Sequence, residues 1–113
     1  MKTLTCDVLV IGGGPAGLAA AYEARQTGAA SIIIVERNDE PGGILPQCIH
    51  NGFGLRVFGA DLTGPEYAYR WITRARQEGV GILDRTMVLE LSAEHGAVVS
   101  EYPPGTLPAR FRF

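Results

Sequence analysis

The sequence is poor in cysteine, in long apolar runs and in charge of one sign. Its two cysteines, Cys6 and Cys48, are far apart, which fits a reducing compartment rather than a disulfide scaffold. No apolar run approaches the roughly 18 to 20 residues that cross a bilayer. Ten Lys and Arg nearly balance twelve Asp and Glu, so no basic patch of the kind that binds nucleic acid is present. We therefore expect a cytoplasmic domain with no membrane span, no nucleic-acid partner and no metal site.

Glycine, in contrast, is abundant, and a glycine-rich turn separates the apolar run 8–11 from the small-residue helical segment 18–24. This turn reads Gly12-Gly13-Gly14-Pro15-Ala16-Gly17. In a G-x-G-x-x-G turn, Gly12 permits the tight change from strand to helix, Gly14 lets the backbone approach a pyrophosphate, and Gly17 lets the helix lie close to the strand. The proline suits the first position of the helix, whose unpaired N–H groups would receive the phosphates. The sequence therefore predicts a dinucleotide-binding turn.

An acidic residue at the tip of the next apolar run extends this motif. Glu36 follows 32–35, at the expected distance of about 20 residues from the turn, and would accept a hydrogen bond from a ribose hydroxyl. Its carboxylate would repel the ribose phosphate of NADP, but it fits both NAD and FAD. The pair Gly42-Gly43 favours FAD, because a flavin unit often needs a second glycine pair where the chain turns back beneath the cofactor. With Arg37, these residues complete the predicted FAD contacts; an NAD-binding dehydrogenase domain is the alternative.

On these residues, 6–60 resembles the N-terminal FAD-binding segment of the glutathione-reductase-like flavoproteins, which have two dinucleotide units. The run from Pro41 to Leu55 is similar to a bacterial branch of FAD-dependent pyridine-nucleotide oxidoreductases. These are often partners of a second flavoprotein subunit. The resemblance implies hydride transfer through the flavin between a small substrate or NAD(P)H and an electron acceptor. It also implies that backbone near Val88 touches the adenine.

Cys48 and His50 lie in the same run and are candidates for chemistry. Disulfide reductases of this superfamily have a C-x-x-x-x-C pair just after the second glycine pair, and this chain has no such pair. By resemblance the loop around Cys48 approaches the flavin. A packed thiol and a hydrogen-bonded loop histidine are the alternative interpretations of the two residues. Cys6 is expected to be a small buried side chain.

The alternation of apolar and helical segments predicts an α/β fold with three layers. Parallel strands are expected at 6–11, 31–36 and 80–84, joined by helical crossovers, with an antiparallel hairpin or meander near 86–101. The second crossover helix should begin with a capping box of Thr63 and Glu66, run to about residue 77, and bury Trp71.

The length allows one domain. We expect a single FAD/NAD(P)-binding domain over 1–113, with a Rossmann-like parallel core over 1–84 and the start of a β-meander over 85–113. A flavoprotein of the resembled kind is several times longer, and no second G-x-G-x-x-G is present. The chain is therefore predicted to be an incomplete N-terminal part that is inactive alone. A non-catalytic fragment that needs missing segments or a partner subunit remains an alternative.

Overall fold

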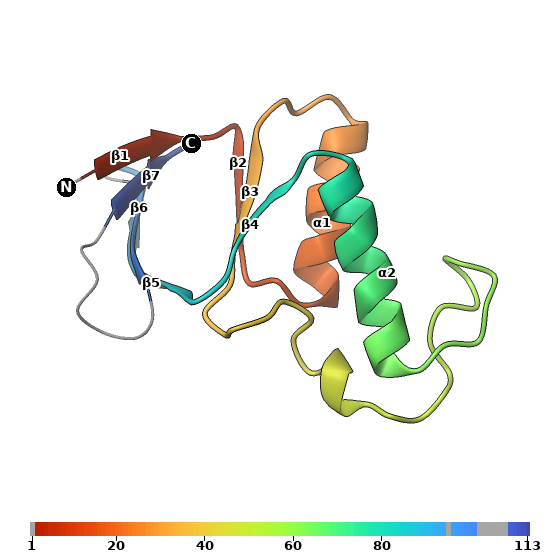
Figure 1. The fold of residues 1–113 in the computed structure, drawn as a ribbon. Coiled ribbons are helices and arrows are strands. Elements are labelled where there is room, and N and C mark those ends of the chain that lie inside the picture. Colours follow the sequence, from red (N-terminus) through yellow and green to blue (C-terminus); the bar gives the residue numbers. More distant parts are fainter. Residues whose placement is uncertain (1, 95, 102–108) are drawn as a thin grey trace.

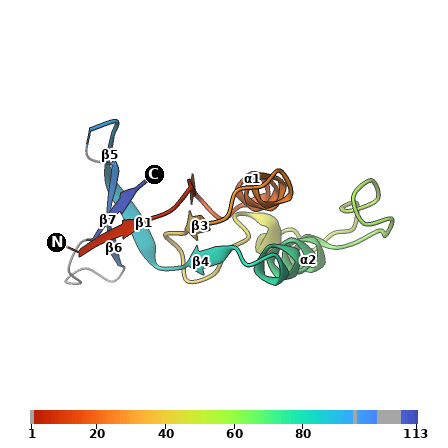
Figure 2. The same ribbon diagram turned by 90° about the horizontal axis from the view of Figure 1, so that it is seen from above.

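The computed structural model describes residues 2–94, 96–101 and 109–113 and arranges them in three layers. The middle layer is a parallel sheet with the order β2-β3-β4. Its strands are β2 (Val8–Ile11), β3 (Ile32–Val35) and β4 (Gly81–Leu83). Helices α1 (Pro15–Gln26) and α2 (Gly64–Gln77) cover one face, and a second sheet covers the other (Figures 1 and 2). The predicted three-layer α/β fold is confirmed.

The parallel pairing follows the predicted topology. Val8 lies opposite Ile32 and Ile34 lies opposite Ile82, both in parallel register. Each strand is shorter than predicted, and β2 begins two residues late. The reason lies at Asp7, whose Oδ2 accepts hydrogen bonds from the N–H groups of Ala30 (3.0 Å) and Ser31 (2.9 Å). The chain therefore bends at Asp7 before it enters the sheet.

The second sheet has the order β1-β7-β6-β5. Its strands are β1 (Lys2–Thr5), β5 (Thr86–Ser92), β6 (Gly96–Glu101) and β7 (Ala109–Arg112). The antiparallel β5–β6 hairpin and its continuation into β7 were predicted, although His95 in the connecting turn lies outside the described residues. Strand β1 was not predicted, and Cys6, which the predicted strand 6–11 included, lies between β1 and β2. It pairs in parallel with β7, more than a hundred residues away, and no local pattern signals such a pairing.

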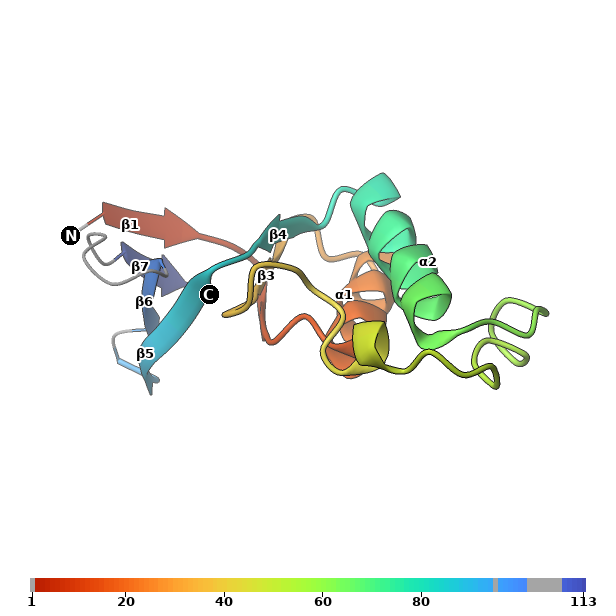
Figure 3. The same ribbon diagram turned by 60° about the horizontal axis from the view of Figure 1, so that its bottom comes forward.

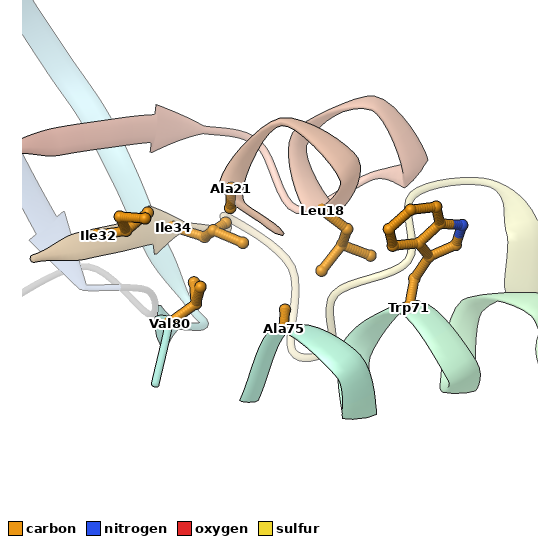
Figure 4. Packing of buried hydrophobic residues seen from close by; sticks show 7 residues of the cluster. All are labelled: Leu18, Ala21, Ile32, Ile34, Trp71, Ala75 and Val80. Carbon is orange, nitrogen blue, oxygen red and sulfur yellow. The ribbon is translucent and has the colours of Figure 1, made fainter. Parts of the chain in front are cut away.

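The parallel sheet is covered on both faces, as is usual for such sheets, and its central strand β3 is the most buried of the three. On the helix side, Ile32 and Ile34 pack with Leu18, Ala21, Trp71, Ala75 and Val80 (Figure 4). Trp71 is 7% exposed, so its predicted place in the core is confirmed. On the other side, Val35 packs with residues of the second sheet, among them Phe111. Strand β3 is thus held between two apolar layers.

Helix α2 begins with the predicted capping box. The Thr63 hydroxyl oxygen accepts a hydrogen bond from the N–H of Glu66 (3.3 Å), and Glu66 Oε1 accepts one from the N–H of Thr63 (3.0 Å). The Thr63 hydroxyl also donates to Glu66 Oε1 at 2.8 Å. The backbone hydrogen bond from Thr63, followed by the one from its side chain, lowers the pKa of Glu66.

Replacing Thr63 by alanine should therefore lower the free energy of unfolding by about 1 kcal/mol. The lowered pKa of Glu66 means that its contribution is present above its unfolded-state pKa and is lost as the pH falls through its folded-state pKa. The difference between wild type and Thr63→Ala should shrink over that range. Urea unfolding at a series of pH values measures it. Thr27→Ala, at the exposed C-terminal end of α1, is the control and should show no such pH dependence; a pH-independent difference for Thr63→Ala would contradict the capping role of the carboxylate.

Candidate functional site

The glycine-rich turn connects the end of β2 to the start of α1. Gly12 has a φ of 102°, which residues with a side chain rarely adopt. Its N–H donates to the carbonyl of Val35 at 2.8 Å. Gly14 is the N-cap of α1 and Pro15 its first residue, and no side chain caps this end. The first-turn N–H groups of Ala16 and Gly17 therefore have no partner within the helix. The structure places there a set of backbone donors that suits an anion.

Gly17 packs directly against the turn. A Cβ atom at this position would overlap the carbonyl oxygen of Gly12 and lie 3.2 Å from Val10 Cγ1. Only a residue without a side chain lets α1 approach β2 this closely. This close approach places the start of α1 beside the end of β2.

Glu36 follows β3 and is 5% exposed. Its Oε1 accepts a hydrogen bond from the N–H of Gly13 at 2.9 Å, and its Oε2 accepts one from the N–H of Asn38 at 2.8 Å. A carboxylate offers about four acceptor positions, so about two remain for a ligand. Glu36, the residue predicted to bind the ribose, thus lies directly against the glycine-rich turn.

The second glycine pair also returns to this turn. The loop after β3 turns back and passes the start of α1 before it reaches the short helix η1 (Leu45–Gln47) (Figure 3). The N–H of Gly42 donates to the carbonyl of Gly13 at 2.6 Å. A Cβ atom at Gly43 would lie 3.2 Å from the Cα of Gly14. The two glycine-rich segments therefore pack backbone against backbone.

A cleft of about 500 Å³ opens at the carboxyl ends of β2 and β3, where open parallel sheets bind ligands. Its lining comprises Ile11, Gly12, Val35, Glu36, Arg37, Asn38, Gly43, Thr86, Met87 and Val88. Five predicted contacts, from Gly12 to Val88, are thus brought together. A second hollow of about 630 Å³ shares Arg37, Asn38, Gly43 and Met87 with it.

Of the lining that comes from β5, the resemblance predicted Val88, but sequence reasoning missed Thr86 and Met87. Arg85 adopts a φ of 49°, and its N–H donates to the carbonyl of Asn38 at 2.9 Å. The N–H of Thr86 donates to the carbonyl of Glu36 at 2.8 Å. These bonds direct β5 along the cleft and bring Met87 and Val88 to its wall. A backbone strained in this way is typical of functional sites, but it left no signal in the sequence.

Cys48 and His50 do not line the cleft. The thiol of Cys48 donates to the carbonyl of Ile44 at 3.5 Å, and Nδ1 of His50 lies 3.0 Å from the carbonyl oxygen of Asn51. Both residues therefore have local partners in the loop, and their part in chemistry stays a prediction. Cys6 is buried, and this burial, followed by the charge of Asp7, raises the pKa of its thiol.

Two kinds of feature are absent from the described residues, 2–94, 96–101 and 109–113. No group of three or more His, Cys, Asp or Glu side chains there could hold a metal ion. None of the helices in this part of the chain is long and apolar enough to span a membrane.

The fold and the cleft together define a dinucleotide-binding α/β unit with a parallel sheet between helices and a β-meander. The model of the family described as FAD dependent oxidoreductase matches residues 7–91. The chain belongs to this family. This membership supports the predicted FAD-binding function, and the alternative of a non-catalytic fragment is not favoured over it.

Individual relatives agree with the family. Thioredoxin reductase of Ureaplasma parvum serovar 3 is 37% identical over 68% of this chain and 24% of its own length. Sarcosine oxidase subunit alpha of Corynebacterium sp. strain U-96 is 35% identical over 85% of this chain and 9% of its own. The chain therefore spans a quarter or less of these two relatives. The crystal structure of thioredoxin reductase from Streptococcus pyogenes MGAS5005 superimposes with a TM-score of 0.69 at 23% identity, covering 94% of this chain and 33% of that one. This likeness concerns the fold.

Proposed function

We propose that the cleft beside Glu36 binds the adenosine diphosphate half of FAD. The observation that carries this proposal is the convergence of three features on the glycine-rich turn at the edge of the cleft. These are the uncapped start of α1, the Glu36 carboxylate and the Gly42-Gly43 return. The donors and acceptors fit the group, because the phosphates need N–H donors and the ribose needs an acceptor. When bound, the flavin supplies the hydride chemistry, and the protein positions it.

Each part of the site has a distinct role in this proposal. The first-turn N–H groups of Ala16 and Gly17, at the positive end of α1, stabilise the pyrophosphate charge. The remaining acceptor positions of Glu36 bind the ribose hydroxyls. Met87 and Val88 provide an apolar wall for the adenine, and Arg37 places a positive charge beside the cleft. The same carboxylate disfavours NADP, whose ribose phosphate it would repel.

For the whole protein we propose hydride transfer through the flavin between a small substrate or NAD(P)H and an electron acceptor. We propose further that it works with a second flavoprotein subunit. Support comes from the similarity to sarcosine oxidase subunit alpha, which is named as one subunit of its enzyme. The two free cysteines support a cytoplasmic location, where thiols stay reduced.

Titration with related cofactors tests the binding proposal. FAD should bind, and ADP should displace it, because both contain the adenosine diphosphate half. FMN lacks the adenosine, and NADPH carries the extra phosphate, so both should bind more weakly. Quenching of flavin fluorescence reports FAD and FMN binding, and calorimetry reports ADP and NADPH. The proposal fails if FMN binds as tightly as FAD or if ADP does not displace FAD.

Glu36→Ala should weaken FAD binding by about 1.5 to 3 kcal/mol, since a hydrogen bond to a charged acceptor is lost. This range corresponds to about 10- to 150-fold in the dissociation constant. The control is Glu23→Ala, which removes an exposed acid from α1 and should leave the affinity unchanged. Equal affinity of Glu36→Ala and wild type would exclude Glu36 as the ribose ligand.

A further inference from the structure

We infer that Glu36 is also a positioning residue, which holds the glycine-rich turn in its binding shape before any ligand arrives. The inference rests on the proposed function, in that the turn receives the phosphates. It goes beyond the ribose contact, because it assigns Glu36 an effect on the part of the ligand that the carboxylate does not touch.

The geometry around Gly13 carries the inference. This residue occupies a variable position of the G-x-G-x-x-G pattern, so the motif gives it no role. In the structure it is held on three sides. Its N–H donates to Oε1 of Glu36 at 2.9 Å, its carbonyl accepts from the N–H of Gly42 at 2.6 Å, and a Cβ atom here would lie 3.1 Å from the Cβ of Pro41. The hydrogen bonds of Gly13 therefore hold the turn against Glu36 and the Gly42-Gly43 segment.

The Glu36 carboxylate is itself fixed. Its second oxygen accepts from the N–H of Asn38 at 2.8 Å, so each oxygen has one backbone donor and the group cannot rotate without losing both bonds. The residue is also almost completely buried, and its own N–H donates to the carbonyl of Leu83 at 2.8 Å. A buried carboxylate is stable only with such donors. Because the backbone of Glu36 is bonded to β4 and its side chain to Gly13, Glu36 fixes Gly13 relative to the parallel sheet.

Preorganisation of this kind strengthens binding because the ligand need not order the turn. If Glu36 acts in this way, its removal weakens binding even of a ligand that has no ribose hydroxyls. If it acts only as a ribose ligand, the effect of its removal disappears with such a ligand. The two roles therefore predict different results for one pair of compounds.

The experiment measures binding of ADP and of 2′,3′-dideoxy-ADP to wild type and to Glu36→Gln by calorimetry. The glutamine keeps the size of the side chain, but its NH₂ group would face one of the two backbone donors. We expect roughly tenfold weaker binding of 2′,3′-dideoxy-ADP, since a buried donor is left unpaired. The loss with ADP should be at least as large, because ADP also contacts the carboxylate through its ribose. A loss seen with ADP and absent with dideoxy-ADP would overturn the inference.

Asp7→Asn is the matched control. Asp7 likewise accepts from two backbone N–H groups, those of Ala30 and Ser31, but at the opposite end of the parallel sheet. It undergoes the same acid-to-amide change and should leave both affinities unaltered. Equal losses in the two variants would mean a general loss of stability and would also overturn the inference.

Amide hydrogen exchange, measured by NMR on the ligand-free chain, gives a test that needs no ligand. In wild type the Gly13 amide should be protected, and in Glu36→Gln it should exchange at least tenfold faster, whereas Asp7→Asn should leave it unchanged. Gly13 exchanging in wild type as fast as an open loop amide would refute the inference even if the variant did not fold. If wild type bound neither compound, the proposed function would fail, and the exchange of Gly13 would still decide this inference.

Discussion

Replacing Gly17 by alanine is expected to abolish detectable FAD binding and to lower the free energy of unfolding by about 3 kcal/mol. The new Cβ would overlap the carbonyl oxygen of Gly12 and lie 3.1 Å from its carbonyl carbon. These are backbone atoms, so no side chain can rotate away. Either α1 moves off β2 or the Gly12 peptide turns, and both displace the donors that would receive the pyrophosphate. Urea unfolding and FAD titration measure the two effects.

Gly81→Ala is the control for this change. Gly81 lies in β4 of the same sheet, and a Cβ there would be 3.6 Å from Ile33 Cγ1 and 3.7 Å from the carbonyl oxygen of Ile32, which are ordinary contacts. Its stability should change by less than about 0.5 kcal/mol, and FAD binding should be retained. A Gly17→Ala protein that binds FAD as wild type does would show that the close approach of α1 is not needed at this site.

The glycine-rich turn could be predicted from the sequence because its determinants are local. An apolar run, a set of glycines and a small-residue helix follow one another directly, and each imposes its own backbone geometry. Glu36 could be placed for a similar reason: the length of the crossover helix brings the next strand beside the first with its tip at the same edge. The parallel register of β2 and β3 confirms this placement of the two strands.

The opposite wall of the cleft could not be predicted in the same way. Met87 reaches the site because Arg85 and Thr86 bond to the backbone of the segment that follows β3, roughly fifty positions earlier in the chain. Strand β1 depends on β7 in the same manner. Such pairings are selected by the tertiary fold and not by the residues next to them, so periodicity alone does not reveal them.

The two hydrogen bonds of the Glu36 carboxylate show a further limit of prediction from a sequence motif. The sequence indicates an acid suited to a ribose, and the structure shows that the same acid also holds Gly13 and Asn38. A motif specifies which residue types a ligand needs. It does not say which of their atoms are already bonded within the protein, and this determines how a substitution will act.

Phe111→Ala is expected to have the largest effect on stability, about 3 to 5 kcal/mol out of a typical total of about 5 to 15. Phe111 is 0% exposed and packs between the two sheets with Cys6, Val35, Ala97 and Val99. Its removal leaves a cavity that strands β1 and β6, paired on either side of β7, cannot close without breaking their register. Thermal and urea unfolding measure the loss.

The same variant tests how the meander serves the site. Strand β5 belongs to the sheet that Phe111 anchors and supplies Thr86, Met87 and Val88 to the cleft, whereas the glycine-rich turn rests on the separate core beneath the helices. At a temperature where the variant remains folded, FAD binding should weaken, because one wall of the cleft is loosened while the phosphate donors stay in place. Phe113→Ala is the control. Phe113 lies two residues further on and is 63% exposed, so its replacement should change neither stability nor binding. If the two variants were equally stable, the interface between the sheets would not hold the meander. If Phe111→Ala were destabilised but kept full FAD affinity, β5 would contribute nothing to the site.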